Sequence, residues 1–331
     1  MVSQHANSPC CGARIRRYGG KRRQCLNCKK TWSIRPLRRG RRRKRLPNET
    51  LLKVIKQGYP LKHFARRRPH LKHITFRHHF RNLLRSFVAR PRKIVLPPGP
   101  LVILLDGLWF QFGGSPWVLY QMALKPCAGA TAIFLDPALL PGRETRVNWE
   151  TAVATIPEDL QQRVVGIAVD NLHGMRLLAR CHHWILQLCQ FHLTLRLYGR
   201  RGMIPHAIRE GPLRHELKAL IRKALSLPVG MEFDAAIRRL SEIALDPLLA
   251  PRIRGLIREF LRNRDHYRAC IQHPNLGLPN TTNAVESMGA RIRRVLQRHK
   301  AASSPRSLML WATAVTRASP DINCASESST E

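Results

Sequence analysis

The sequence predicts an α/β fold for most of the chain, preceded by two small basic segments. Short apolar runs that end in a carboxylate, at residues 101–106 and 164–170, are typical of strands buried on both faces of a sheet. Helical patterns alternate with such runs as they do in α/β domains. Ahead of them, residues 1–92 carry paired cysteines and then basic amphipathic segments, which indicates separate small units.

The charge of the chain is strongly positive. Its 331 residues include 58 Lys and Arg against 20 Asp and Glu, for a net charge of +38. Such an excess attracts a polyanion and suits a phosphate backbone, which is bound through counterion release. No apolar run approaches the roughly 18 residues of a spanning helix, and residues 1–8 lack the apolar stretch of a secretory signal. We therefore expect no membrane association and a cytoplasmic protein at the nucleoid.

Residues 1–34 predict a zinc-ribbon-like unit, with two cysteine turns separated by a short basic hairpin. Cys25 and Cys28 have the spacing of a zinc-ligand pair. In a reducing compartment such a pair favours metal binding over a disulfide. Zn²⁺ is therefore a possible cofactor of this unit.

The first cysteine turn of this unit is irregular. Ser8 stands where a zinc ribbon normally carries its first cysteine, which leaves Cys11 as the third ligand. Either Cys10 or His5 can then supply the fourth. The alternative is a ribbon that no longer holds metal.

Residues 35–45 are almost wholly basic and have no apolar periodicity. They predict a linker or an arm that follows phosphates, with Arg41, Arg42 and Arg43 as DNA-contacting candidates. A solvated run of charge is the alternative.

Residues 46–92 predict short helices arranged as a helix-turn-helix. Asn48 can cap the first helix, Gly58 can end it, and Thr75 can start the third. One face of the third helix is apolar, with Phe76, Phe80, Leu83, Leu84 and Phe87. The opposite face carries the DNA-binding candidates Arg77, His78, Arg81 and Arg85. Trihelical units also often serve only to pack against their neighbours.

Two aspartates follow apolar strands of the predicted sheet. Asp106 and Asp170 each end such a run, at the edge of a sheet where sites form. Further strands are predicted over 117–124, 131–135 and 184–192, with helices over 175–180 and 193–197. Residues 201–277 have a basic helical pattern without strand signal, and the polar tail 319–331 is expected to be disordered.

Glu286 begins the last informative helix. Taken alone, Asn283 as N-cap with Glu286 at the third helical position is close to a capping box, and a first-turn acid suits the helix dipole. The structural interpretation is therefore favoured until the other motifs are considered.

Four motifs of the chain form a recognisable series. In chain order they are Asp106-Gly, Asp170 after an apolar strand, Gln187-x-Cys189-x-x-His192 and Thr-Thr-Asn283-x-x-Glu286. Over roughly residues 95–315 this series resembles bacterial insertion-sequence transposases of the Mutator-like DDE type. The resemblance implies an RNase H-like core formed by residues 97–200 and 278–318, with a helical insertion over 201–277. Asn171 departs from the glycine usual in that family.

The resemblance also implies an activity. Asp106, Asp170 and Glu286 would be an acidic triad for two Mg²⁺ or Mn²⁺ ions, with Cys189 and His192 beside it. The chain would then cleave DNA at transposon ends and transfer strands into target DNA, as a homodimer or higher synaptic complex. The alternative is a catalytically inactive, transposase-derived DNA-binding protein. Three other acids, Asp136, Glu144 and Glu150, are predicted to be surface groups or caps.

Overall fold

The computed structural model describes residue 8 and residues 10–18, 22–33, 46–66, 73–198 and 212–324. The chain forms two compact units, Met1–Pro47 and Asn48–Glu331. His5 and the arm residues Arg41, Arg42 and Arg43 lie outside the described residues.

The first unit is built on a three-stranded antiparallel sheet. Its strands, in sheet order, are β1 (Ile15–Arg17), β2 (Arg22–Cys25) and β3 (Thr31–Ser33). The turn between β2 and β3 closes through the backbone N–H of Cys25, which donates to the Lys30 carbonyl at 2.9 Å. Lys29 adopts a left-handed φ of 59° in this turn. The tight turn brings Cys25 and Cys28 to the same end of the sheet.

The second unit has a mixed sheet, so the predicted α/β class is confirmed. The sheet order is β10-β6-β5-β4-β8-β9, and β7 pairs with β5. Its strands are β4 (Leu101–Phe112), β5 (Ser115–Pro126), β6 (Thr131–Phe134), β7 (Ala138–Pro141), β8 (Val164–Val169), β9 (Ile185–Leu188) and β10 (Asp321–Asn323). β5 is antiparallel to β4, whereas β8 is parallel to β4 and β9 is parallel to β8.

The central strand β4 runs past its predicted end at Asp106. Gly113 and Gly114, with φ of 57° and 79°, form a two-residue turn, and positive φ at both positions is what such a hairpin requires. β4 and β5 can therefore pair from Leu101↔Pro126 to Phe112↔Ser115. Asp106 consequently lies within the strand and not at its end.

Two predictions at strand ends are wrong. The strand expected over 184–192 stops at Leu188: the Cys189 N–H still bonds to the Val169 carbonyl of β8, but that of Gln190 bonds to the Asn280 carbonyl. The tail 319–331, expected to be disordered, contributes β10, in which Ile322 faces Ala132 of β6. A sheet edge offers backbone partners to any extended segment, whatever its side-chain polarity.

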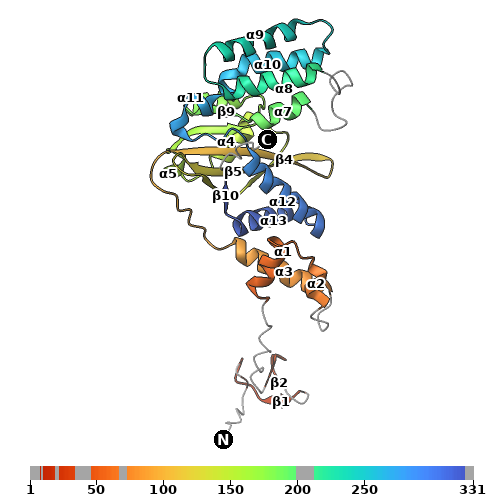
Figure 1. Ribbon diagram of the computed structural model, residues 1–331. Coiled ribbons are helices and arrows are strands. Elements are labelled where there is room, and N and C mark those ends of the chain that lie inside the picture. Colours follow the sequence, from red (N-terminus) through yellow and green to blue (C-terminus); the bar gives the residue numbers. More distant parts are fainter. Residues whose placement is uncertain are drawn as a thin grey trace. The chain divides into compact units, whose positions relative to one another are not determined.

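Helices cover both faces of the sheet. α4 (Arg146–Val153), α5 (Glu158–Gln161) and α6 (Met175–Cys181) pack on the face that carries Ile103 and Tyr120. Trp149 of α4 meets Tyr120 edge to face, with ring centroids 4.6 Å apart. α12 (Asn283–His299) contacts β4 and β5, and α13 (Pro305–Ala318) lies beside α12 (Figure 1).

The predicted helical segment forms its own layer. It comprises α8 (Pro212–Ser226), α9 (Met231–Leu245), α10 (Pro251–Tyr267), α11 (Ala269–Gln272) and the short η2 (Pro274–Leu276). α8, α9 and α10 lie together at the side of the sheet remote from α12 (Figure 1). α10 also contacts β9 and α7 (Gln190–Tyr198), which anchors this layer to the sheet.

The predicted helix-turn-helix belongs to the second unit. α1 (Asn48–Ile55), α2 (Leu61–Arg66) and α3 (His73–Val88) precede the sheet, and α1 and α3 contact α13. Phe80 of α3 packs on Trp311 with ring centroids 5.6 Å apart. Arg317 joins the two parts, since it donates to the Val88 carbonyl at 2.6 Å and to Asp136 Oδ1 at 2.9 Å.

Among the described residues, no helix combines the length and the apolar character that crossing a membrane requires.

Candidate active site and cysteine cluster

The three acids of the predicted triad line one cavity. Asp106 of β4, Asp170 after β8 and Glu286 of α12 border a space of about 450 Å³, together with Glu144 and His192. The chain separates these residues by up to 180 positions (286 minus 106). Their convergence is therefore a product of the tertiary fold.

The parallel pairing of β4 and β8 brings the two aspartates together. Leu104 of β4 lies opposite Ala168 of β8. Side chains two positions apart in an extended chain project to the same face. Asp106 and Asp170, each two residues further along, therefore reach the same side of the sheet.

Glu286 is held by a contact that differs from the predicted capping box. The N-cap of α12 is Thr282, and Asn283 is already the first helical residue, so Glu286 is one position too far along for a capping box. Instead the Thr282 hydroxyl donates to Glu286 Oε1 at 2.8 Å. The backbone N–H of Thr282 donates to Cys189 Sγ at 3.3 Å. Thr282, which is 1% exposed, thus orients the carboxylate from its own helix turn.

His192 lies between two acids of the cavity. Its Nδ1 is 3.5 Å from Glu286 Oε1 and 3.8 Å from Asp170 Oδ1. A hydrogen bond with the Cys189 side chain, helped by the charges of Asp170 and Glu286, raises the pKa of His192 to about 9. The ring is therefore cationic at neutral pH. Because α7 starts at Gln190, His192 lies on a helix and not at the predicted strand end.

The motif Gln187-x-Cys189-x-x-His192 has a structural part. Gln187 is fully buried, accepts from the Cys270 N–H at 2.7 Å and donates to the Tyr267 carbonyl at 3.0 Å. It therefore fastens β9 to the end of the helical layer. Cys189 is buried against Thr282, so the motif connects three segments at the site.

The acidic side chains of the cavity repel one another. Burial, and then the negative charges of Glu286 and Glu144, raise the pKa of Asp106 to about 7. His192 and Arg293 oppose that shift only in part. An unneutralised group of carboxylates at one cavity is a favourable place for a cation.

Glu144 is a site residue that sequence reasoning missed. It was expected at the surface, but it accepts hydrogen bonds from Trp149 Nε1 at 3.0 Å and Trp109 Nε1 at 3.3 Å. Burial raises the pKa of its carboxyl. A Cβ on Gly107 would lie 2.6 Å from Glu144 Oε1, so the glycine after Asp106 makes room for this acid. Asp136 and Glu150, in contrast, pair with Arg317 and Arg146.

Asn171 connects the second aspartate to the helical layer. Its side-chain amide donates to Glu259 of α10, and its backbone N–H donates to Asp170 Oδ1 at 2.6 Å. Arg196 of α7 holds the same Glu259 through two bonds of 2.7 Å. A glycine at position 171 could not make the side-chain contact, so this position couples the site to α10.

Gly289 lets α12 approach the sheet. A Cβ there would lie 2.9 Å from both Gln121 Nε2 and Leu108 Cδ2. We expect Gly289→Ala to lower the free energy of unfolding by about 1–3 kcal/mol through overpacking, measured by urea denaturation. Gly255→Ala is the matched control, because position 255 is exposed on α10 and a Cβ there meets nothing within 4 Å. It should be stabilising by roughly 0.5–1 kcal/mol. Equal effects at both positions would contradict the close packing of α12.

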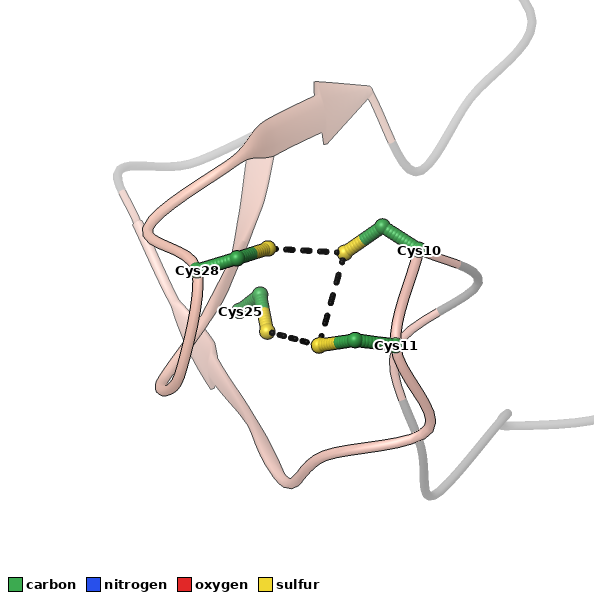
Figure 2. A group of neighbouring side chains, drawn as sticks. All are labelled: Cys10, Cys11, Cys25 and Cys28. Atoms are coloured by element: carbon green, nitrogen blue, oxygen red, sulfur yellow. Dashed lines mark hydrogen bonds between the residues drawn. The ribbon is translucent and has the colours of Figure 1, made fainter.

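The first unit brings four cysteines into one cluster, which could hold a metal ion such as zinc (Figure 2). Their sulfur atoms all lie within 4.8 Å of one another. The Sγ atoms of Cys10 and Cys28 are 3.1 Å apart, and those of Cys11 and Cys25 are 3.3 Å apart. Four thiolates around one zinc ion lie about 3.8 Å apart, so a small adjustment accommodates the ion. Of the two candidates for the fourth ligand, Cys10 is therefore in place.

Ser8 lies beside this cluster. It is 4% exposed, and its Oγ is 2.6 Å from Cys10 Sγ. Hydrogen bonding to Ser8 is the main reason that the pKa of Cys25 is lowered to about 6. A lowered pKa favours the thiolate, which is the form that binds metal. The serine at the expected ligand position therefore lies against the cluster without supplying a thiol to it.

The DNA-binding candidates of α3 are solvent-exposed. Arg77, His78 and Arg81 line a second cavity with α12 and α13, whereas Arg85 does not. The fold thus separates the predicted basic face into two parts.

Comparison with profiles of known protein families and with curated protein sequences finds no match for this chain. What indicates a function is therefore the chemistry of the two sites. One gathers hard carboxylate oxygens around a cavity, and the other gathers thiols.

Proposed function

We propose that this protein is a DDE transposase of the Mutator-like insertion-sequence type. It would cleave DNA at transposon ends and transfer the strands into target DNA. The observation that carries the proposal is the cavity shared by Asp106, Asp170 and Glu286. Phosphodiester cleavage needs charge neutralisation at phosphorus and an activated oxygen nucleophile, and carboxylates that hold divalent ions are a recurrent means to both.

The sheet supports an RNase H-like core for this activity. Three antiparallel strands, β4, β5 and β6, are followed by β8 and β9, which continue the sheet in parallel beyond β4. This order makes β4 central and β8 its neighbour, which places Asp106 and Asp170 side by side. The helical layer between α7 and α12 corresponds to the proposed insertion.

The donor set fits Mg²⁺ or Mn²⁺. Both are hard cations that prefer carboxylate oxygen, and the pKa of Asp106 is raised to about 7 partly by neighbouring negative charge that a cation would neutralise. Asp106, Asp170 and Glu286 would hold two ions. When bound, such ions supply Lewis acidity and lower the pKa of water.

The protein's own side chains would prepare the substrate. His192 faces Asp170 and Glu286, where it would position the scissile phosphate. Thr282 keeps the Glu286 carboxylate in one orientation. Arg293 of α12 lines the same cavity and would bind a phosphate oxygen.

DNA is the proposed partner of the whole chain. The net charge of +38 supports phosphate contacts, including those of the arm residues Arg41, Arg42 and Arg43. The cysteine cluster supports a zinc ribbon in the first unit. Two transposon ends must be joined, so the active form would be a homodimer or higher synaptic complex at the nucleoid.

The pH dependence of stability offers one check of the acidic site. Because the folded-state pKa of Asp106 is raised to about 7, its ionisation opposes folding increasingly as pH rises from about 4 to 7. We expect the Tm of metal-free protein to fall between pH 5 and 8, by more than in Asp106→Asn. Mg²⁺ should raise the wild-type Tm more at pH 8 than at pH 5, as scanning fluorimetry would measure. A Tm difference between wild type and variant that does not vary with pH would contradict this.

The function itself is tested with labelled DNA that carries the terminal repeats of the element. Purified protein is incubated with Mg²⁺ or Mn²⁺ beside Asp170→Ala and Glu286→Ala. Metal-dependent nicking that both variants lose is the expected result. Tight binding without cleavage in any metal would overturn the proposal in favour of a DNA-binding relic.

A further inference from the structure

A second cavity lies where α3 meets α12 and α13. It has a volume of about 470 Å³, and the described residues that line it include no acid. Its polar and charged lining includes Arg77, Arg81, His299, Lys300, Ser303 and Ser307. The acidic cavity is lined by none of these residues. A concave surface with this lining attracts an anion.

The two arginines are one helical turn apart on α3. Arg77 and Arg81 are separated by four positions and project from the same side, so their like charges disfavour each other. The apolar Phe80 of the same helix is 1% exposed and packs on Trp311, which fixes the helix against α13. The guanidinium groups are therefore brought to the cavity by a packed element.

His299 is the buried polar group of this cavity. It is 6% exposed and stacks on Trp311 with ring centroids 5.0 Å apart and an interplanar angle of 16°. Its Nε2 finds no hydrogen-bond partner among the described residues. Burial, and then Arg298 and Arg77, lower the pKa of the ring to about 4. The neutral ring can carry its proton on Nε2, which is then a buried donor without a partner in a residue of the cavity wall.

The chain around His299 also turns toward the cavity. Lys300 caps α12 in a left-handed conformation, with φ of 48° and ψ of 45°, which is uncommon for a residue with a side chain. Ser304 then caps α13 by accepting from the Ser307 N–H at 3.2 Å. The positive end of the α13 dipole therefore lies at the cavity wall, where Ser307 adds its hydroxyl.

We infer that this cavity binds a backbone phosphate of DNA through Arg77, Arg81, Lys300 and the unpartnered His299 Nε2. The inference rests on the proposed function, in that DNA is the substrate, and it assigns α3 a different use from a recognition helix. Arg77 and Arg81, on part of the basic face of α3, hold a phosphate of the DNA backbone between α3 and the helices α12 and α13. Such contacts fix position on DNA and do not read bases.

Binding to duplex DNA in EDTA tests the inference without any cleavage. Fluorescence anisotropy over a salt series compares wild type with His299→Phe and with the double variant Arg77→Ala/Arg81→Ala. His299→Phe keeps an aromatic ring on Trp311 but removes the donor. We expect roughly fivefold to tenfold weaker binding, with the slope of log K against log salt reduced by about 1 for each arginine removed and unchanged in His299→Phe, whose ring is neutral. Arg238→Ala, at an exposed arginine of α9 that lines neither cavity, is the control and should change affinity less than twofold.

A second readout follows His299 directly. In protein labelled at histidine, the ring resonance that is absent from His299→Phe should shift when duplex DNA is added. Unchanged DNA binding in both cavity variants, or an equal loss in Arg238→Ala, would overturn the inference. A shift with inorganic phosphate while the variants bind DNA normally would also overturn it, because the cavity would then be a small-anion site. Failure of cleavage, with binding still lost in the variants, would reject only the proposed function.

Discussion

Asp106→Asn should abolish DNA cleavage and leave the protein at least as stable as the wild type. The pKa of Asp106 is raised to about 7, because burial and the negative charges of Glu286 and Glu144 make its ionised form unfavourable. Asparagine has nearly the same shape and no charge, so it relieves that repulsion. It also removes the negative oxygen that would hold a divalent ion. We expect cleavage to fall by roughly a thousandfold or more.

The measurement pairs single-turnover cleavage with thermal unfolding at pH 8. Asp136→Asn is the matched control, because Asp136 forms ion pairs with Arg317 and Arg92 outside the acidic cavity. That variant should show the reverse pattern, with a lower Tm and near-normal cleavage per folded molecule. If Asp106→Asn retained cleavage within tenfold of wild type, the acidic cavity would not be the catalytic site.

Cys25→Ser should release bound zinc and unfold the first unit, while the second unit keeps its stability. Cys25 is fully buried at the end of β2, and its sulfur is 3.3 Å from that of Cys11. Structural zinc contributes roughly 10–16 kcal/mol to the folding of small zinc-binding units. A three-stranded sheet of this size has little apolar core to compensate for such a loss.

Zinc content per chain, measured by mass spectrometry, should fall from about one to near zero. Proteolysis should then cut rapidly within residues 1–47 and spare 48–331. Cys181→Ser is the control, because this exposed thiol lies on α6 of the second unit. Cys10→Ser should also release the ion, whereas His5→Ala should retain it. Wild-type protein that binds neither zinc nor cobalt would refute the metal-binding cluster.

Local patterns in the sequence were enough to locate the strands that lead to Asp106 and Asp170. The apolar runs before Asp106 and Asp170 reveal buried strands because a strand covered on both faces must be apolar at every position. The helical pattern within residues 201–277 indicates helices such as α8 for the same kind of reason, since one face of each helix must be buried. Cys25 and Cys28 could be paired as ligands because their spacing is local.

Helix starts and strand ends were less accessible to such patterns. Whether Asn283 or Thr282 caps α12 depends on Cys189, which bonds to the Thr282 backbone from another segment. The end of β9 depends likewise on Gln190 meeting the Asn280 carbonyl. β10 forms because β6 offers it an edge, which its own polar sequence does not reveal.

Only the tertiary structure decided which side chains share a cavity. Glu144 reaches Asp106 because Gly107 leaves space and because Trp109 and Trp149, far apart in sequence, both donate to its carboxylate. His299 and Arg77 line one cavity because α3 packs on α13. The physical reason is the same for both cavities. Contacts between distant segments follow from sheet order, register and helix packing, whereas a sequence pattern reports only the burial and spacing of its own neighbourhood.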